Sequence, residues 1–68
     1  MKTTFNINNG YVCVIFKKLP NGMFDAKHAL VIDGVQITNY SGVSSQGFAS
    51  KDEVVDFIRK NYYENKQP

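Results

Sequence analysis

The sequence has very few of the residues that stabilise small domains by covalent or metal links. Its 68 residues include one cysteine, Cys13, and one histidine, His28. An internal disulfide needs two cysteines, and a zinc site needs about four Cys or His ligands at set spacings. We therefore expect no disulfide, metal or other cofactor. A domain this small buries only about 60% of its unfolded surface, which favours self-association or a partner as an added source of stability.

Strong charge of one sign and long apolar runs are lacking as well. The formal net charge is +2, and the eight basic residues are spread along the chain rather than clustered for phosphate binding. No apolar run approaches the length of a membrane span, and the start shows no signal-peptide pattern. We expect a cytoplasmic protein with no membrane partner. Residues 1–64 are expected to form a single domain, and the polar residues 65–68 to fray.

What the sequence does contain is a regular series of turn signals. Asn9-Gly10, Asn21-Gly22 and Asp33-Gly34 are spaced twelve residues apart. Asn-Gly and Asp-Gly adopt the positive φ angles that tight hairpins need. The segments around them are rich in β-branched and aromatic residues: Thr3–Asn8, Tyr11–Leu19, Met23–Ile32 and Val35–Tyr40. The series predicts a four-stranded antiparallel β-meander.

The turn lengths predict how these strands pair. Two-residue turns at the first and third dipeptides would pair Phe5 with Val14 and Leu30 with Ile37. The middle turn has Pro and Gly positions that fit a type I turn with a G1 bulge, which would pair Val14 with His28. This register gives one consistently apolar face: Phe5, Ile7, Val12, Val14, Phe16, Phe24, Ala26, Leu30, Ile32, Val35 and Ile37. A slip by one residue would mix the two faces.

A C-terminal helix is predicted to cover that apolar face. Ser50 followed by Glu53 is a capping box. One side of the helix is apolar, with Val54, Val55, Phe57, Ile58 and Tyr62. The other side carries Asp52, Glu53, Asp56, Lys60 and Tyr63. The predicted fold class is α+β, a four-stranded antiparallel β-meander packed against one C-terminal α-helix (ββββα).

The segment between the last strand and the helix has the spacing of a phosphate-binding loop. Gly42 and Gly47 are five residues apart, but Phe48 and Ala49 stand where such a loop needs Lys and then Ser or Thr. The two groups that hold phosphate and magnesium are therefore missing. We interpret the glycines as turn residues, and Phe48 as a side chain packed under the start of the helix.

The second face of the sheet is predicted to be the functional surface. It combines apolar and aromatic side chains with lysines at the margin, and Lys17 would lie opposite Asp25 as a cross-strand ion pair. The candidate interface residues are Tyr11, Cys13, Ile15, Lys17, Lys27, Ala29, Val31 and Tyr40. Exposed apolar patches often mark binding sites. The alternative is that the termini or the 41–48 loop fold over this face.

Three functions compete for this surface. We favour a non-catalytic protein–protein interaction module, either a homodimer or an inhibitor- or adaptor-like partner of a larger protein. The alternative is nucleic-acid binding through Tyr11, Tyr40, Lys17, Lys18 and Lys27. A small enzyme is less favoured, because Cys13 and His28 are predicted on opposite faces and so cannot form a nucleophile–base pair.

Overall fold

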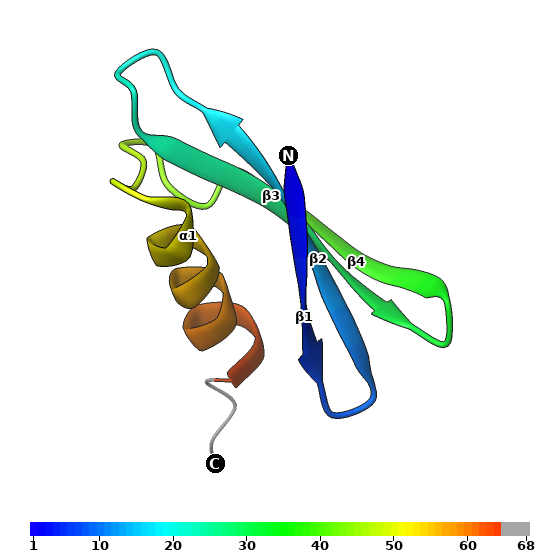
Figure 1. The fold of residues 1–68 in the computed structure, drawn as a ribbon. Coiled ribbons are helices and arrows are strands. Elements are labelled where there is room, and N and C mark those ends of the chain that lie inside the picture. Colours follow the sequence, from blue (N-terminus) through cyan, green and yellow to red (C-terminus); the bar gives the residue numbers. More distant parts are fainter. Residues whose placement is uncertain (65–68) are drawn as a thin grey trace.

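A computed structural model of the chain describes residues 1–64, so the tail predicted at 65–68 lies outside the described residues. The element order is β1 (Lys2–Ile7), β2 (Gly10–Lys18), β3 (Phe24–Ile32), β4 (Val35–Ser41), α1 (Lys51–Ile58) and η1 (Arg59–Glu64). The strands form one antiparallel sheet in the order β1-β2-β3-β4, and the helix lies on one side of it (Figure 1). The predicted ββββα fold is confirmed.

The central pairing of β2 with β3 follows the predicted register. Val14 lies opposite His28 and Val12 opposite Leu30. The connecting loop is a type I turn in which the Gly22 N–H donates to the Leu19 carbonyl at 2.9 Å, and Gly22 has a φ of 85°. The positive φ at this position is what a G1 bulge requires, and it explains the glycine.

The pairing of β1 with β2 differs from the prediction by two residues. Phe5 lies opposite Val12 rather than Val14, and the turn residues are those at 8–9 rather than Asn9-Gly10. Gly10 belongs to β2, where a Cβ would collide with the Val31 carbonyl oxygen. The glycine therefore allows a close backbone approach rather than a turn. A shift of two residues leaves each side chain on its predicted face.

The pairing of β3 with β4 contains a β-bulge that the sequence did not predict. Ile32 lies opposite Val35 as expected, but Leu30 lies opposite Thr38 rather than Ile37. The extra residue, Ile37, reverses the facing of the rest of β4. Tyr40 consequently pairs with His28, on the helix side of the sheet, and not with the interface residues where we had expected it.

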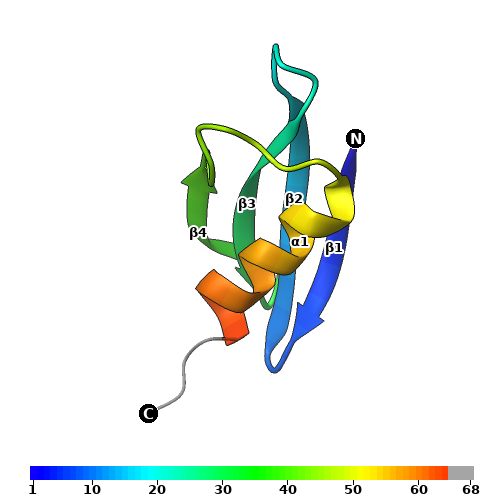
Figure 2. The same ribbon diagram turned by 90° about the vertical axis from the view of Figure 1, so that its left-hand side faces the viewer.

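The helix begins as predicted. The Ser50 Oγ accepts the Glu53 N–H at 3.2 Å, and Glu53 Oε1 accepts the Ala49 N–H at 3.2 Å. α1 crosses β2 and β3 diagonally (Figure 2). Five fully buried apolar side chains form the core between sheet and helix: Val12, Val14, Ala26, Val54 and Ile58. Hydrophobic burial on this one face of the sheet holds the two layers together.

The last helical turn is a π-helix, and it corrects the predicted outward position of Tyr63. A π-helix closes hydrogen bonds between residues five apart instead of four. The wider turn brings Tyr63 to the sheet side, where its ring meets the Phe5 ring edge-on at 5.9 Å. The adjacent Tyr62 faces the sheet as predicted and contacts His28.

The loop from β4 to α1 packs against the start of β3. Phe48 and Phe24 exchange backbone hydrogen bonds of 2.7 and 2.8 Å, and the Phe48 ring lies 5.1 Å from the Phe57 ring. The Ser44 Oγ accepts the Gly47 N–H at 3.0 Å. The loop is thereby held as a turn on the helix side of the sheet, in line with its interpretation as a connection rather than a phosphate site.

Candidate functional site

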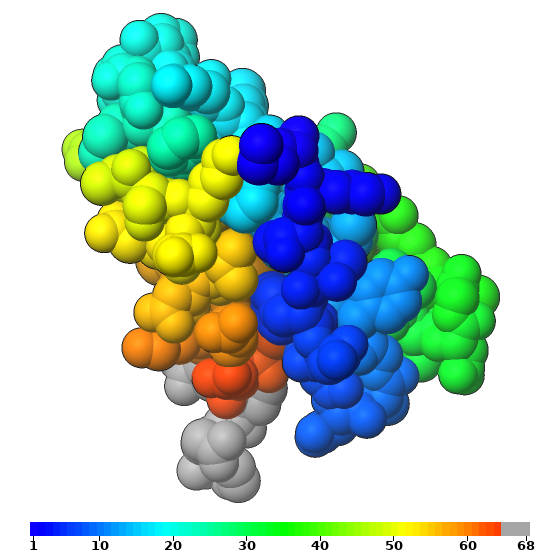
Figure 3. Space-filling model, viewed as in Figure 1, coloured from blue at the N-terminus to red at the C-terminus, as the bar shows by residue number. Residues whose placement is uncertain are grey.

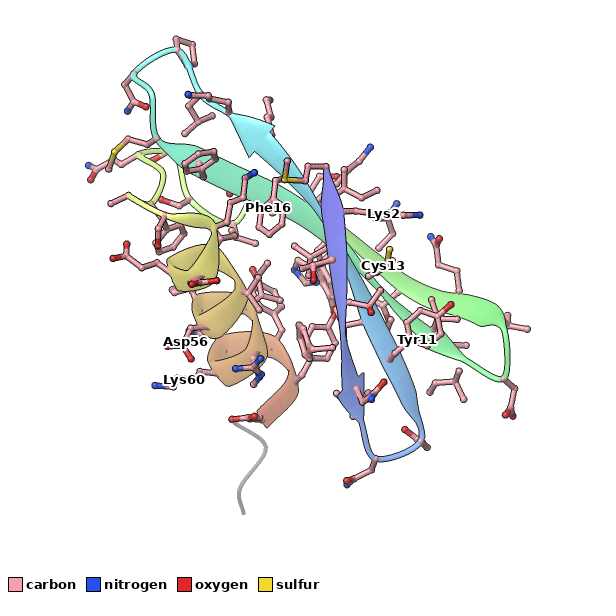
Figure 4. All side chains as sticks on the ribbon, in the orientation of Figure 1. Lys2, Tyr11, Cys13, Phe16, Asp56 and Lys60 are labelled. Atoms are coloured by element: carbon pink, nitrogen blue, oxygen red, sulfur yellow. The ribbon has the colours of Figure 1, made fainter. Side chains whose placement is uncertain are left out.

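The sheet face opposite α1, called here the open face, has a regular grid of side chains. Antiparallel partners directly opposite one another share a face. The register therefore gives three cross-strand rows from β1 to β4: Asn6, Tyr11, Val31 and Gln36; Thr4, Cys13, Ala29 and Asn39; Lys2, Ile15, Lys27 and Ser41. The two central strands supply the apolar side chains, and Tyr11 and Cys13 point away from α1 while Phe16 points toward it (Figure 4).

The alternative, that a terminus or the 41–48 loop covers the open face, is not found within residues 1–64: Ser41 and Gly42 only border the face, and Val43 and Phe48 pack against the core. The loop after β4 packs on the helix side, and Met1 continues β1 through a hydrogen bond of 3.0 Å from the Phe16 N–H to its carbonyl. Tyr11 and Ile15 are each 40% exposed. Both side chains are large, so burying them against a partner would be favourable.

Two adjoining hollows run along the open face. The first has a volume of about 280 Å³. Its lining includes Tyr11, Cys13, Ile15, Lys27, Ala29, Val31, Gln36 and Asn39. The second, of about 370 Å³, includes Ile15, Lys17, Asp25, Lys27, Ser41 and Gly42. Ile15 and Lys27 line both hollows and form the ridge between them. Seven of the eight predicted interface residues therefore lie together around these hollows.

Tyr40 is the predicted interface residue that does not join them. Its ring stacks on His28 with centroids 4.9 Å apart and lies 5.1 Å from the Tyr62 ring. Lys18, which was a candidate for phosphate contacts, also lies on the helix side, with its Nζ 5.6 Å from the centre of the Phe24 ring. The open face thus keeps a single aromatic side chain, Tyr11.

Lysines dominate the charge of the open face. Lys2, Lys17 and Lys27 are all exposed there. The carboxylate opposite Lys17, that of Asp25, is buried and accepts the Val43 N–H at 3.1 Å. No ion pair within residues 1–64 joins it to Lys17, so the pair predicted from the sequence is not formed. Asp25 instead anchors the start of the loop, as a buried carboxylate needs a donor.

Lys2 is a residue of this face that the sequence reasoning missed. The predicted β1–β2 register placed Lys2 beside Lys17, at the end of the sheet. The true register places it directly beside Ile15, in line with Lys27. Gly10 is the residue that could have indicated the position of Lys2. If Gly10 is the first residue of a strand and not a turn residue, the turn consists of Asn8 and Asn9, and Lys2 then pairs with Ile15.

The opposite face contains a buried cluster around His28, whose side chain is 1% exposed. Its Nδ1 lies 2.7 Å from the Tyr63 Oη, and the rings of Tyr40 and Tyr62 pack against it. Burial lowers the pKa of His28. Burial, with the neighbouring Tyr40 and Tyr62, raises the pKa of Tyr63 to about 12. Cys13 points to the other side of the sheet, so it cannot pair with His28 as a nucleophile.

A further hollow of about 730 Å³ lies between β1 and α1. Its walls mix both signs of charge, with Lys51 and Arg59 beside Asp52 and Asp56. The cations lie over aromatic rings, Lys51 at 5.6 Å from Phe16 and Arg59 at 4.9 Å from Phe5. The two cationic groups thus already make intramolecular cation–π contacts. This hollow is therefore a weaker candidate for a binding site than the open face.

Residues 1–64 form neither a metal-binding cluster nor a membrane-spanning helix. No three or more His, Cys, Asp or Glu side chains within residues 1–64 are grouped to hold a metal ion. Within the same residues, no helix is long and apolar enough to cross a membrane. Comparisons with protein-family models, curated proteins and solved structures found no match to the chain.

Proposed function

We propose that the protein is a non-catalytic protein–protein interaction module that acts in the cytoplasm through its open face. The observation that carries this proposal is the exposure of Tyr11 and Ile15 beside the two hollows, on a face that no described segment covers. The core lies entirely on the other face. The apolar side chains of the open face therefore do not contribute to the core. Exposed apolar side chains of this kind are typical of a surface that binds another molecule.

The physical character of the open face suits a protein partner. It stands on β2 and β3, the two central strands, whose backbone groups are already paired within the sheet. Such a platform loses little conformational freedom on binding, because its side chains are fixed to a rigid sheet. An apolar centre ringed by polar groups, here Asn39 and Gln36 with the lysines, is the usual anatomy of a protein interface.

Nucleic-acid binding is the weaker alternative. Of the five residues that would carry it, Tyr40 and Lys18 lie on the helix side. Binding to single strands relies on several aromatic rings that stack on successive bases. Tyr11 alone offers one such ring. Binding of this kind would also weaken steeply with added salt, since phosphate contacts release counterions.

Photo-cross-linking in the cells that make the protein tests the proposal. A benzoylphenylalanine in place of Tyr11 puts a reactive ring in the first hollow, and the same residue in place of the exposed Asp52 on α1 is the matched control. We expect a discrete protein adduct from position 11 and none from position 52. Benzophenone reacts only with groups in contact, so the adduct reports direct binding.

The adduct also identifies the class of partner. A mass that corresponds to a second copy indicates a homodimer, and any other discrete protein mass indicates a larger partner. Removal of the adduct by nuclease would establish the nucleic-acid alternative. Equal labelling from positions 11 and 52, or no adduct from position 11, would contradict the proposal.

A further inference from the structure

We infer that the open face binds a foreign protein surface that presents an apolar side chain next to carboxylates. This inference rests on the proposed function and specifies the partner. It follows from the distribution of charge on the face: three exposed lysines lie at one end, and the one carboxylate beside them, that of Asp25, is buried.

The cationic end of the open face is a single row of the grid. Ile15 on β2 has Lys2 directly beside it on β1 and Lys27 directly beside it on β3. Lys17 follows two residues further along the same strand, on the same face. Three exposed ammonium groups thus surround one exposed apolar side chain. The row at the opposite end of the grid carries Tyr11 with neutral amides on its flanks, so the face has a charged end and an uncharged end.

The row keeps an excess of positive charge, because the one carboxylate of residues 1–64 that lies beside it is buried and already accepts a hydrogen bond. Asp25 is buried with its Oδ1 bonded to the loop, and Asp33 lies in the turn between β3 and β4. The remaining four are on the helical segment, on the other side of the sheet: Asp52, Glu53, Asp56 and Glu64. Asp56 and Glu64 already pair with Arg59 and Lys60.

This distribution argues against a second copy as the occupant. Two open faces related by a two-fold axis along the strands would bring the lysine rows together. An axis across the strands would place each lysine row over the Tyr11 end of the other copy. The first arrangement is opposed by like charges, and the second brings to the lysines only Asp33, in the turn beyond the neutral Tyr11 row. A second copy thus supplies at most one exposed carboxylate for each row of three lysines. A foreign surface with carboxylates has no such restriction.

The chemistry of the partner follows from the two parts of the face. An apolar side chain from the partner would enter the first hollow, against Tyr11, Ala29 and Val31. Its carboxylates would lie over Lys2, Lys17 and Lys27, since opposite charges steer the encounter and fix the orientation. Gln36 and Asn39 offer amide groups to the partner's backbone at the other side of that hollow.

Three synthetic peptides of equal length test the inference. The first is rich in Glu with a central Leu-Phe pair, the second has Lys in place of each Glu, and the third has Ser in place of the apolar pair. Each is added to isotope-labelled protein, and amide chemical shifts report the contact. We expect the first peptide to bind most tightly and to shift the amides of Ile15, Lys27 and Val31.

Two charge variants give the matched control. Lys27→Glu removes one ammonium from the row and adds a repulsive charge, so we expect it to weaken binding of the first peptide about tenfold. Lys60→Glu makes the same change in net charge on the exposed surface of η1. We expect it to leave the affinity unchanged, because the helical segment lies on the other side of the sheet.

The outcomes separate this inference from the proposed function. If the Lys peptide binds the open face as well as the Glu peptide, or if Lys27→Glu has no effect, the acidic partner is wrong while the binding face stands. If no peptide binds and light scattering shows a dimer that Tyr11→Ser with Val31→Ser dissociates, the occupant is a second copy. If no peptide binds a monomeric protein, the acidic partner is also wrong. Shifts confined to the helix would overturn both proposals.

Discussion

At the scale of single residues, Gly47 shows how tightly the β4–α1 connection is packed. Its φ is 85°, a backbone conformation that residues other than glycine rarely adopt. A Cβ at this position would lie 2.6 Å from the Met23 Cβ and 2.7 Å from the Leu19 Cδ1. The loop can therefore lie against the β2–β3 hairpin only because this residue lacks a side chain.

Gly22 is a matched control for this site. It has the same φ of 85°, but nothing lies within 4 Å of where its Cβ would be. We expect Gly22→Ala to lower the free energy of unfolding by about 1 kcal/mol, the cost of the left-handed backbone alone. Gly47→Ala adds overpacking and should cost about 3 kcal/mol in total. Thermal unfolding followed by circular dichroism measures both, and equal losses would contradict the described packing of the loop.

At the scale of elements, the docking of η1 onto the sheet depends on a buried histidine. His28 on β3 is enclosed by Tyr40 from β4 and by Tyr62 and Tyr63 from η1. These contacts are to tyrosine rings, and its Nε2 has no hydrogen-bond partner within the described part of the chain. A protonated imidazole is therefore poorly accommodated, which is why burial lowers the pKa.

This cluster predicts how stability depends on pH. The unfolded state binds a proton near pH 6.5, whereas the folded state does so only at a lower pH. The free energy of unfolding should be at its full value above pH 6.5 and fall as the pH drops below it, by at most about 1.4 kcal/mol per unit. His28→Phe keeps an aromatic ring in the cluster and should remove this slope between about pH 6.5 and 5.

Denaturant unfolding at a series of pH values measures the effect. A wild-type slope equal to that of His28→Phe would mean that His28 is not buried in its neutral form. Any pH dependence that remains in His28→Phe comes from groups other than His28, so the difference between the two slopes is the contribution of His28.

The elements themselves differ in how well the sequence predicted them. Turn chemistry and alternation gave the four strands, the β2–β3 register and the helix cap, since each depends on local residues. The bulge at Ile37 and the π-helical turn at 59–64 accompany the packing of Tyr40, Tyr62 and Tyr63 around His28, which joins residues far apart in the sequence. A bulge leaves the composition of a strand unchanged, so the alternation of apolar and polar residues on β4 could not reveal that Tyr40 faces the helix.

At the scale of the whole molecule, one helix serves a four-stranded sheet. Figure 3 shows the helical surface packed beside β1, while the β3–β4 hairpin projects beyond it. Four of the six Asp and Glu residues lie on the helical segment, whereas the exposed charges of the open face are those of three lysines, Lys2, Lys17 and Lys27. The molecule is thus asymmetric in both polarity and charge. If the open face is a binding surface, its apolar side chains are not needed for folding.

Two neighbouring cross-strand pairs allow a direct test of this claim. Tyr11 lies opposite Val31 on the open face, and Val12 lies opposite Leu30 on the helix-covered face. Replacing the first pair by serines should cost about 1 kcal/mol, mainly from lost strand preference. Replacing the second pair by serines leaves polar groups and cavities in the core and should cost more than about 4 kcal/mol, close to the whole stability of so small a domain.

The decisive measurement is thermal unfolding of Tyr11→Ser with Val31→Ser beside Val12→Ser with Leu30→Ser. We expect the open-face variant to unfold cooperatively, with a Tm lowered by about 4–8 °C. The core variant should show no folded baseline at 25 °C. Loss of the folded state in the open-face variant would show that these side chains belong to the core, and would contradict their assignment to a binding surface.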